Sequence, residues 1–337
     1  MNKKNNDLKF VVIGGGTGTY SVLSGLKKYT DNITAIVTMA DSGGSAKKER
    51  DEWGLLPSSD IRKSLIALAD VSTQDTLLLR QLFQYRYDQG VGLRGMTFGN
   101  LFLVALTKLL GSQMQAIEKA SQILRIKGKV LPVTMKKIDL AAVYEDGSKV
   151  VGEHFIDEPK HNGNLPIIKL FTQPKATITQ EAKEAIAESD VIIIGPGGFY
   201  TTILANLVIT GVSHAIEKSH AVKFFILNLM TEYGQTYGFS AARFIKELDK
   251  YFPVKHLDYV IVNKTPIPAN ILSRYIKNKA EPVANDLDKS YPFKVVSTDI
   301  LSPKFIKSEK GDVLKRSFVR HDPDKITYEC LKVLNLV

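Results

Sequence analysis

The chain has 337 residues, of which 44% are hydrophobic and 24% are charged, as expected of a folded protein that can bury a substantial core as one or two domains. Its single cysteine, Cys330, excludes an intramolecular disulfide and any cysteine-based metal cluster, and no apolar run is long enough to span a membrane. The net charge is +10, but the lysines are dispersed and surround no nucleic-acid module. We therefore expect a cytoplasmic protein without nucleic-acid or membrane partners. Its basic surface favours a small anionic ligand.

The first predicted unit is an apolar strand over residues 10–13, a glycine-rich turn and a helix over residues 20–29. Glycine allows a phosphate to approach main-chain N–H groups closely, so the turn is a candidate phosphate-binding site. The standard dinucleotide and P-loop motifs are both missed, because Thr19 replaces a third glycine and no Gly-Lys-Ser/Thr follows. The alternative is a turn that only lets the helix pack closely on the sheet. The candidate ligand-binding residues here are Gly14, Gly15, Gly16, Thr17 and Gly18.

A second buried strand is predicted over residues 33–39, and Asp41 follows it. At this position a carboxylate could hold a ribose hydroxyl or a metal on a phosphate, or it could simply cap the turn. Asp60 and Arg62 begin the next apolar helix, and Asn100 opens another. These three residues are candidate ligand contacts, and their alternative roles are helix caps and surface charge.

Alternating residues between 129 and 156, interrupted by a turn at 145–148, predict a small antiparallel β addition over residues 127–158. The parallel pattern then returns, with a strand at 190–194 that ends in a second glycine-rich turn and a helix. Gly195, Gly197 and Gly198 are its candidate ligand contacts. A second unit of strand, glycine turn and helix is harder to explain by packing alone.

Further strands are predicted at 223–229 and 259–262, and Asn228, Thr231 and Asn263 near their ends are candidate ligand contacts. The whole pattern predicts a three-layer Rossmann-like α/β fold with a mainly parallel sheet. We expect a nucleotide-binding domain over residues 8–322 and a C-terminal helix over 323–337 that packs on it. None of the six histidines has ligand spacing to another, and no catalytic serine arrangement can be read.

Seven motifs, spread in order through nearly the whole chain, resemble the CofD/YvcK family of 2-phospho-L-lactate transferases and bacterial gluconeogenesis factors. They are IGGGTG (13–18), ADSGGS (40–45), LPSSDIR (56–62), GNLFLVAL (99–106), GPGGFYTTILANL (195–207), NLMTEYGQTYGFSAARFI (228–245) and RHD (320–322). The resemblance is greatest to the YvcK-like branch, and it implies binding of a UDP-sugar and a role in cell shape and carbon regulation. It also implies that Tyr275 and Arg320 contact the sugar nucleotide.

Three hypotheses remain, of which the first two follow from the resemblance and the third from Asp41 as a possible partner of a ribose hydroxyl. The first is a regulatory protein that binds a UDP-N-acetylglucosamine-like nucleotide sugar. The second is a transferase that moves a phospholactyl-type group from a nucleotide diphosphate donor to a deazaflavin or another hydroxyl acceptor, with Asp41 as its catalytic residue. The third is a binder of an NAD-type dinucleotide. No cofactor is expected, apart from Mg²⁺ on Asp41 in a transferase, and Ser42 in place of a second aspartate weakens that expectation. The sequence leaves a homo-oligomer open.

Overall fold

The computed structural model describes residues 7–160, 162–304 and 318–337. Within these residues, seven strands form a parallel sheet in the order β10-β9-β8-β7-β1-β2-β3. They are β1 (Phe10–Gly14), β2 (Ile33–Val37), β3 (Lys129–Pro132), β7 (Val191–Ile194), β8 (Val222–Ile226), β9 (Tyr259–Asn263) and β10 (Lys294–Thr298). The chain moves outward from β1 to β3 on one side and from β7 to β10 on the other. The prediction of a Rossmann-like parallel sheet is confirmed, and the strand order reverses between β1 and β7.

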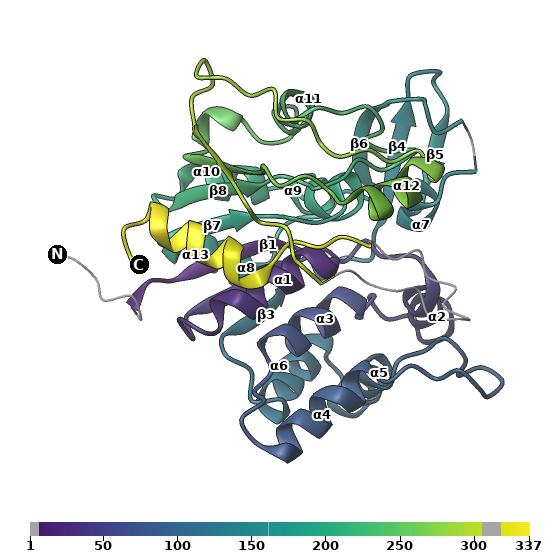
Figure 1. Cartoon of the computed structure of the whole chain (residues 1–337). Coiled ribbons are helices and arrows are strands. Elements are labelled where there is room, and N and C mark those ends of the chain that lie inside the picture. The colour runs from purple at the N-terminus through teal and green to yellow at the C-terminus, as the bar shows by residue number, and fades with distance from the viewer. Residues whose placement is uncertain (1–6, 161, 305–317) are drawn as a thin grey trace.

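Helices cover both faces of the sheet (Figure 1). One hydrophobic core joins the sheet to α1 (Gly16–Leu26), α3 (Ser59–Leu68), α5 (Phe98–Leu110), α6 (Gln113–Ile123), α12 (Ala269–Lys277) and α13 (Pro323–Val333). The core of the other face contains α8 (Gln180–Glu188), a continuous helical segment made of η2 (Phe199–Leu204) and α9 (Ala205–Leu207), α10 (Val212–Lys218) and α11 (Ala241–Leu248). The remaining helices are α2 (Gly44–Trp53), α4 (Gln74–Gln84), α7 (Glu153–Asp157) and η3 (Val254–His256).

The strand β1 shows why its sequence is uniformly apolar. Val11 and Ile13 belong to one core, whereas Phe10 and Val12 belong to the other. Side chains alternate between the two faces of a strand, so a strand covered on both faces needs apolar residues at every position.

A small antiparallel sheet has the strand order β5-β4-β6, with β4 (Asp139–Tyr144), β5 (Lys149–Val151) and β6 (Ile167–Gln173). It contains the predicted hairpin, but its bounds differ from residues 127–158. The residues of β3 belong instead to the main sheet, where they pair in parallel with β2. Gly152, with φ of 109°, ends the hairpin strand, and the segment after it forms the short helix α7.

The C-terminal helix α13 packs on α1, the helix that follows the first glycine turn. Ile326 and Cys330 share a core with Val22 and Leu26 of α1. Asp322 caps this helix, because its Oδ1 accepts hydrogen bonds of 3.0 Å from both Asp324 N and Lys325 N. None of the helices that the structure describes combines the length and apolarity that crossing a membrane requires.

Candidate functional site

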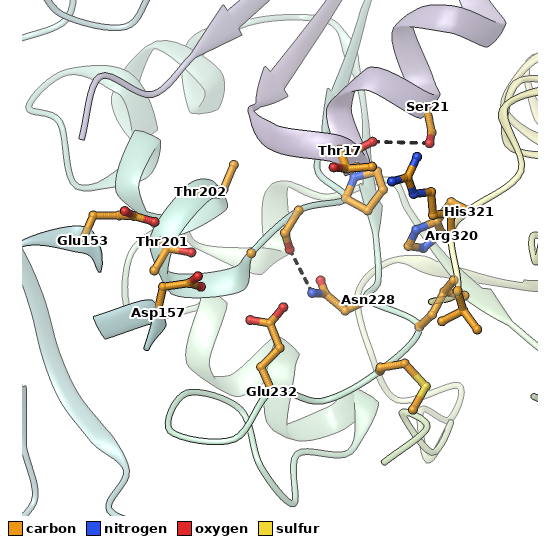
Figure 2. A pocket seen from close by; sticks show the side chains of 17 residues that line it. Thr17, Ser21, Glu153, Asp157, Thr201, Thr202, Asn228, Glu232, Arg320 and His321 are labelled. Atoms are coloured by element: carbon orange, nitrogen blue, oxygen red, sulfur yellow. Dashed lines mark hydrogen bonds between the residues drawn. The ribbon is translucent and has the colours of Figure 1, made fainter. Parts of the chain in front are cut away.

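A cavity of about 300 Å³ opens at the carboxyl ends of β1 and β7, where the strand order reverses. Open parallel sheets bind ligands at this position, because the loops leaving the two strands diverge to opposite faces and leave a crevice. Figure 2 shows the polar side chains that line the cavity: Thr17, Ser21, Glu153, Asp157, Thr201, Thr202, Asn228, Glu232, Arg320 and His321.

The glycines of the first turn have different roles. A Cβ on Gly18 would overlap the carbonyl oxygen of Pro196, so Gly18 allows α1 to pack against the second turn. Gly16, in contrast, has φ of +63° and no atom within 4 Å of where its Cβ would lie. The Gly15 N–H donates to Thr19 Oγ1 at 2.6 Å. The next three amides begin α1 and have no acceptor within the helix, so the partial positive charge of the helix start faces the cavity side.

The second glycine turn, residues 195–198, is tied to the first. Asn206, on the helical segment after that turn, donates to Gly14 O at 2.9 Å. Asn228, at the end of β8, donates from Nδ2 to Gly197 O at 2.8 Å. Thr17 and Gly18 of the first turn, Gly197 and Gly198 of the second, and Asn228 line the cavity. The other predicted contacts in the two turns lie beside the cavity and do not line it: Gly14, Gly15, Gly16 and Gly195.

Arg320 lines the cavity beside Thr17 and Ser21 of α1 (Figure 2), and Tyr275 acts on it indirectly. The Tyr275 hydroxyl accepts a hydrogen bond of 3.0 Å from Val319 N, and its ring packs edge-on against Phe318. Tyr275 is itself buried and does not line the cavity. It therefore positions the segment that carries Arg320. His321 is also buried there, with Nε2 3.0 Å from Leu227 O, and burial lowers the pKa of His321 to about 4.

Carboxylates occupy the other end of the cavity. Glu153 and Asp157 come from α7, and Glu232 comes from the loop after β8. Gln235 donates to Asp157 Oδ1 at 3.1 Å and so fixes that side chain. Burial, followed by the nearby carboxylates of Asp41 and Asp157, raises the pKa of Glu153 well above its usual value. In Figure 2, Glu153 and Asp157 lie on the side opposite Arg320 and His321, with Asn228 between them.

Asp41 and Asp60 lie beside the first glycine turn and not on the wall of this cavity. A Cβ on Gly15 would overlap the Asp60 carboxylate, and Lys63 Nζ contacts Asp60 Oδ1 at 3.0 Å. Burial and then the Asp60 carboxylate raise the pKa of Asp41. Across residues 7–160, 162–304 and 318–337, no three histidine, cysteine or carboxylate side chains are arranged to hold a metal ion.

Arg62 and Asn100 belong to a buried polar network away from the cavity. Arg62 Nε donates to Asn100 Oδ1 at 2.6 Å, and Asn100 Nδ2 donates to Glu49 Oε1 at 2.6 Å. Ser58 N also donates to Glu49, at 2.8 Å. Burial raises the pKa of Glu49 to about 7. The structure gives both side chains partners that join α2, α3 and α5.

Two further candidates are also engaged within the protein. Thr231 forms two hydrogen bonds with the backbone of Glu281, through its N–H at 2.7 Å and its hydroxyl at 2.9 Å. The Asn263 side chain donates to Thr265 O at 2.7 Å and accepts from Thr265 N and Ile300 N, both at 3.3 Å. Asn263 nevertheless lines a second cavity, which shares Asn228 with the first.

Sequence reasoning missed the acidic end of the site. Glu153 and Asp157 fall in a segment that was expected to continue a strand, and only its glycine at 152 signalled a break. His321 was visible only as part of the RHD motif. The hydroxyls of Thr201 and Thr202 lay within the GPGGFYTT motif directly after the second turn, which was the signal that could have identified them.

Comparison with known proteins gives concordant matches over nearly the whole chain. A family model described as 2-phospho-L-lactate transferase CofD matches residues 10–301. The gluconeogenesis factor of Halalkalibacterium halodurans is 39% identical over 333 residues, which cover 98% of this chain and 97% of that protein. The gluconeogenesis factor of Bacillus subtilis is 36% identical over 318 residues, or 94% and 95% of the two chains.

The crystal structure of protein BH3568 from Bacillus halodurans, described as a member of the UPF0052 family, superposes with a TM-score of 0.86. The two chains are 36% identical, and the match covers 98% of this chain and all of the other.

Proposed function

Because this chain belongs to the CofD family, and because relatives of its full length are named gluconeogenesis factors, we propose that it is a regulatory protein that binds a nucleotide sugar of the UDP-N-acetylglucosamine type. In this proposal it acts in the control of cell shape, cell-wall synthesis and carbon metabolism, and the ligand occupies the cavity between the ends of β1 and β7. Turnover of the ligand is not part of this function.

The observation that carries the proposal is the division of charge along the cavity. Arg320 and the start of α1 supply positive charge and backbone donors at one end, which suit a diphosphate. Glu153, Asp157 and Glu232 supply acceptors at the other end, which suit the hydroxyls of a sugar. A nucleotide sugar carries these two kinds of group side by side, and its sugar supplies hydroxyls beyond the diphosphate, where a nucleoside diphosphate ends.

Calorimetric titration of the native protein with UDP-N-acetylglucosamine, GDP, GTP and NAD tests the proposal. We expect UDP-N-acetylglucosamine to bind most tightly, to bind equally in the presence of a metal chelator and to be recovered uncleaved. Arg320→Ala should weaken binding by about tenfold to a hundredfold, since a charge-assisted hydrogen bond contributes about 1.5–3 kcal/mol. Arg94→Ala, an exposed arginine outside the cavity, is the matched control and should bind as the native protein does.

Preferential binding of NAD, or the absence of UDP-sugar binding, would contradict the proposal. If Arg320→Ala and Arg94→Ala change the affinity equally, the diphosphate does not bind at the Arg320 end of the cavity.

A second candidate function, a CofD-like transfer of a phosphorus-containing group, is favoured by two carboxylates, one beside the first glycine turn and one at the acidic end of the cavity. Asp41 and Glu153 both have raised pKa values, which are common where a carboxylate acts as a general base. Metal-dependent release of a nucleoside monophosphate or diphosphate, on addition of a deazaflavin or another hydroxyl acceptor, would replace the regulatory proposal with this one.

A further inference from the structure

A second cavity, of about 320 Å³, lies next to the first at the carboxyl ends of β8 and β9. The two cavities share Asn228 and Leu229. We propose that this second cavity, here named the base slot, holds the nucleobase of the bound nucleotide sugar. The inference rests on the proposed function and adds which part of the ligand lies where.

The chemistry of the base slot suits a flat, uncharged, mostly apolar ring. Its walls include Leu229, Ile267, Leu272, Pro282 and Val283. Among the described residues that line it, only Lys264 is charged, and that side chain is exposed. Apolar walls with a few convergent polar groups are typical of small-molecule sites, in which the walls supply contact area and the polar groups fix orientation.

Two asparagines, Asn228 and Asn263, are among the residues that line the slot. The Asn228 Oδ1 atom is buried and has no hydrogen-bond partner, while Nδ2 of the same side chain is fixed on Gly197 O. A buried acceptor that lacks a donor is costly unless a ligand satisfies it, and the ring N–H of a nucleobase is such a donor. The Asn263 side chain fixes residues 263–265 through its bonds to Thr265, so that loop is already ordered before binding.

The order of charges sets the direction of the ligand. With phosphates held by Arg320 and the start of α1, Asn228 lies between Arg320 and the carboxylates of α7 (Figure 2), and it also borders the base slot. A sugar placed against the carboxylates leaves the nucleoside to extend past Asn228, directly into the base slot. Another cavity, next to α2, is lined by Lys47, Arg50 and Lys137 together with two aspartates, and these charges do not suit a neutral ring.

Filling the base slot tests this inference. Val283→Phe enlarges a side chain on its wall, and Val151→Phe makes the same change in the cavity next to α2 as a matched control. Binding of UDP and UDP-N-acetylglucosamine is measured by calorimetry, and binding of N-acetylglucosamine 1-phosphate, which has no nucleoside, by ligand-observed NMR. Leu272→Phe, on the α12 wall, is a second slot-filling variant in case Val283→Phe does not fold.

We expect the slot-filling variants to bind UDP and UDP-N-acetylglucosamine about tenfold more weakly or worse than the native protein does. They should bind N-acetylglucosamine 1-phosphate with native affinity and unfold at the native melting temperature. The control should bind all three ligands normally. Unchanged binding of UDP by a folded slot-filling variant would overturn the inference while leaving the proposed function intact. Equal loss of all three ligands would also overturn it, because the effect would not be specific to the nucleoside. Failure of the native protein to bind either UDP compound would instead contradict the proposed function.

Discussion

His321 combines a place in the cavity wall with a buried, uncharged imidazole. Only 8% of the residue is exposed, and its Nε2–H donates to Leu227 O. Burial lowers its pKa to about 4, whereas an unfolded chain would hold a histidine near its ordinary value of 6.5. Between these two pH values the folded protein binds fewer protons at His321 than the unfolded chain does. Stability must therefore fall as pH falls from 6.5 through 4.

This linkage predicts that protonation of His321 lowers the free energy of unfolding by about 3 kcal/mol as the pH falls from 6.5 to 4. Glutamine can still donate to Leu227 O but does not titrate, so His321→Gln should lose less stability on acidification. Urea unfolding at several pH values between 7 and 4.5 measures the difference. Raised carboxyl pKa values at Asp41, Glu49 and Glu153 contribute equally to both proteins and cancel in the comparison. If the free energy of unfolding of the two proteins depends on pH in the same way, His321 does not cause the loss of stability.

At the scale of elements, α13 supports the cavity from outside. It packs on α1, and a Cβ on Gly25 of α1 would overlap the Pro323 carbonyl oxygen at the start of α13. The start of α13 is therefore held against α1. Arg320 and His321 of the cavity wall come directly before this helix start in the chain. Stability of this helix end is therefore linked to the geometry of the ligand site.

Removal of the cap tests how much this helix end contributes to stability. Asp322→Ala deletes the acceptor of two backbone N–H groups and should lower the free energy of unfolding by about 1 kcal/mol. Asp324→Ala, in the first turn of the same helix, removes an equal charge and only an exposed ion pair with Lys28, so its effect should be smaller. Thermal and denaturant unfolding of both variants measures the difference. An equal loss in the two variants would mean that charge near the helix start, and not the cap, accounts for the stability.

Element prediction from sequence worked where burial on both sides of a segment imposes a simple pattern. The apolar runs of β1, β2, β7, β8 and β9 were identified for this reason. The edge strand β10 was not, because Lys294–Thr298 is only partly buried and lacks such a run. Residues 47–56 are rich in charge and have no apolar run that predicts a helix, yet most of them form α2, which a single buried carboxylate, Glu49, connects to α3 and α5. A long-range hydrogen bond of this kind leaves no local signal in the sequence.

At the scale of the whole molecule, the topology creates the site. Strand order reverses between β1 and β7, so two glycine turns that are about 180 residues apart in the chain meet at one crevice. Both turns could be predicted from sequence as candidate ligand sites. The carboxylates of α7 could not, because they reach the crevice only through the small antiparallel sheet, whose placement depends on tertiary packing. Arg62, Asn100 and Thr231 share motifs with the site but bond within the protein.

The central claim is that the first glycine turn faces a bound phosphate, and a side chain at Gly16 tests it most directly. Asparagine tolerates the left-handed backbone that φ of +63° requires, and its Cβ would meet no protein atom within 4 Å. Gly54, with φ of +68° and equally open surroundings at the end of α2, provides the matched control. Both variants should therefore fold with similar small losses of stability.

Calorimetric titration with UDP-N-acetylglucosamine then compares Gly16→Asn, Gly54→Asn and the native protein. We predict that Gly16→Asn weakens binding by about tenfold or more, because a side chain at the start of α1, next to Thr17 and Gly18 of the cavity wall, would crowd a phosphate that binds the first amides of the helix. Gly54→Asn should bind as the native protein does. Native-like affinity in a folded Gly16→Asn protein would contradict the account and leave the glycine turn with a packing role alone.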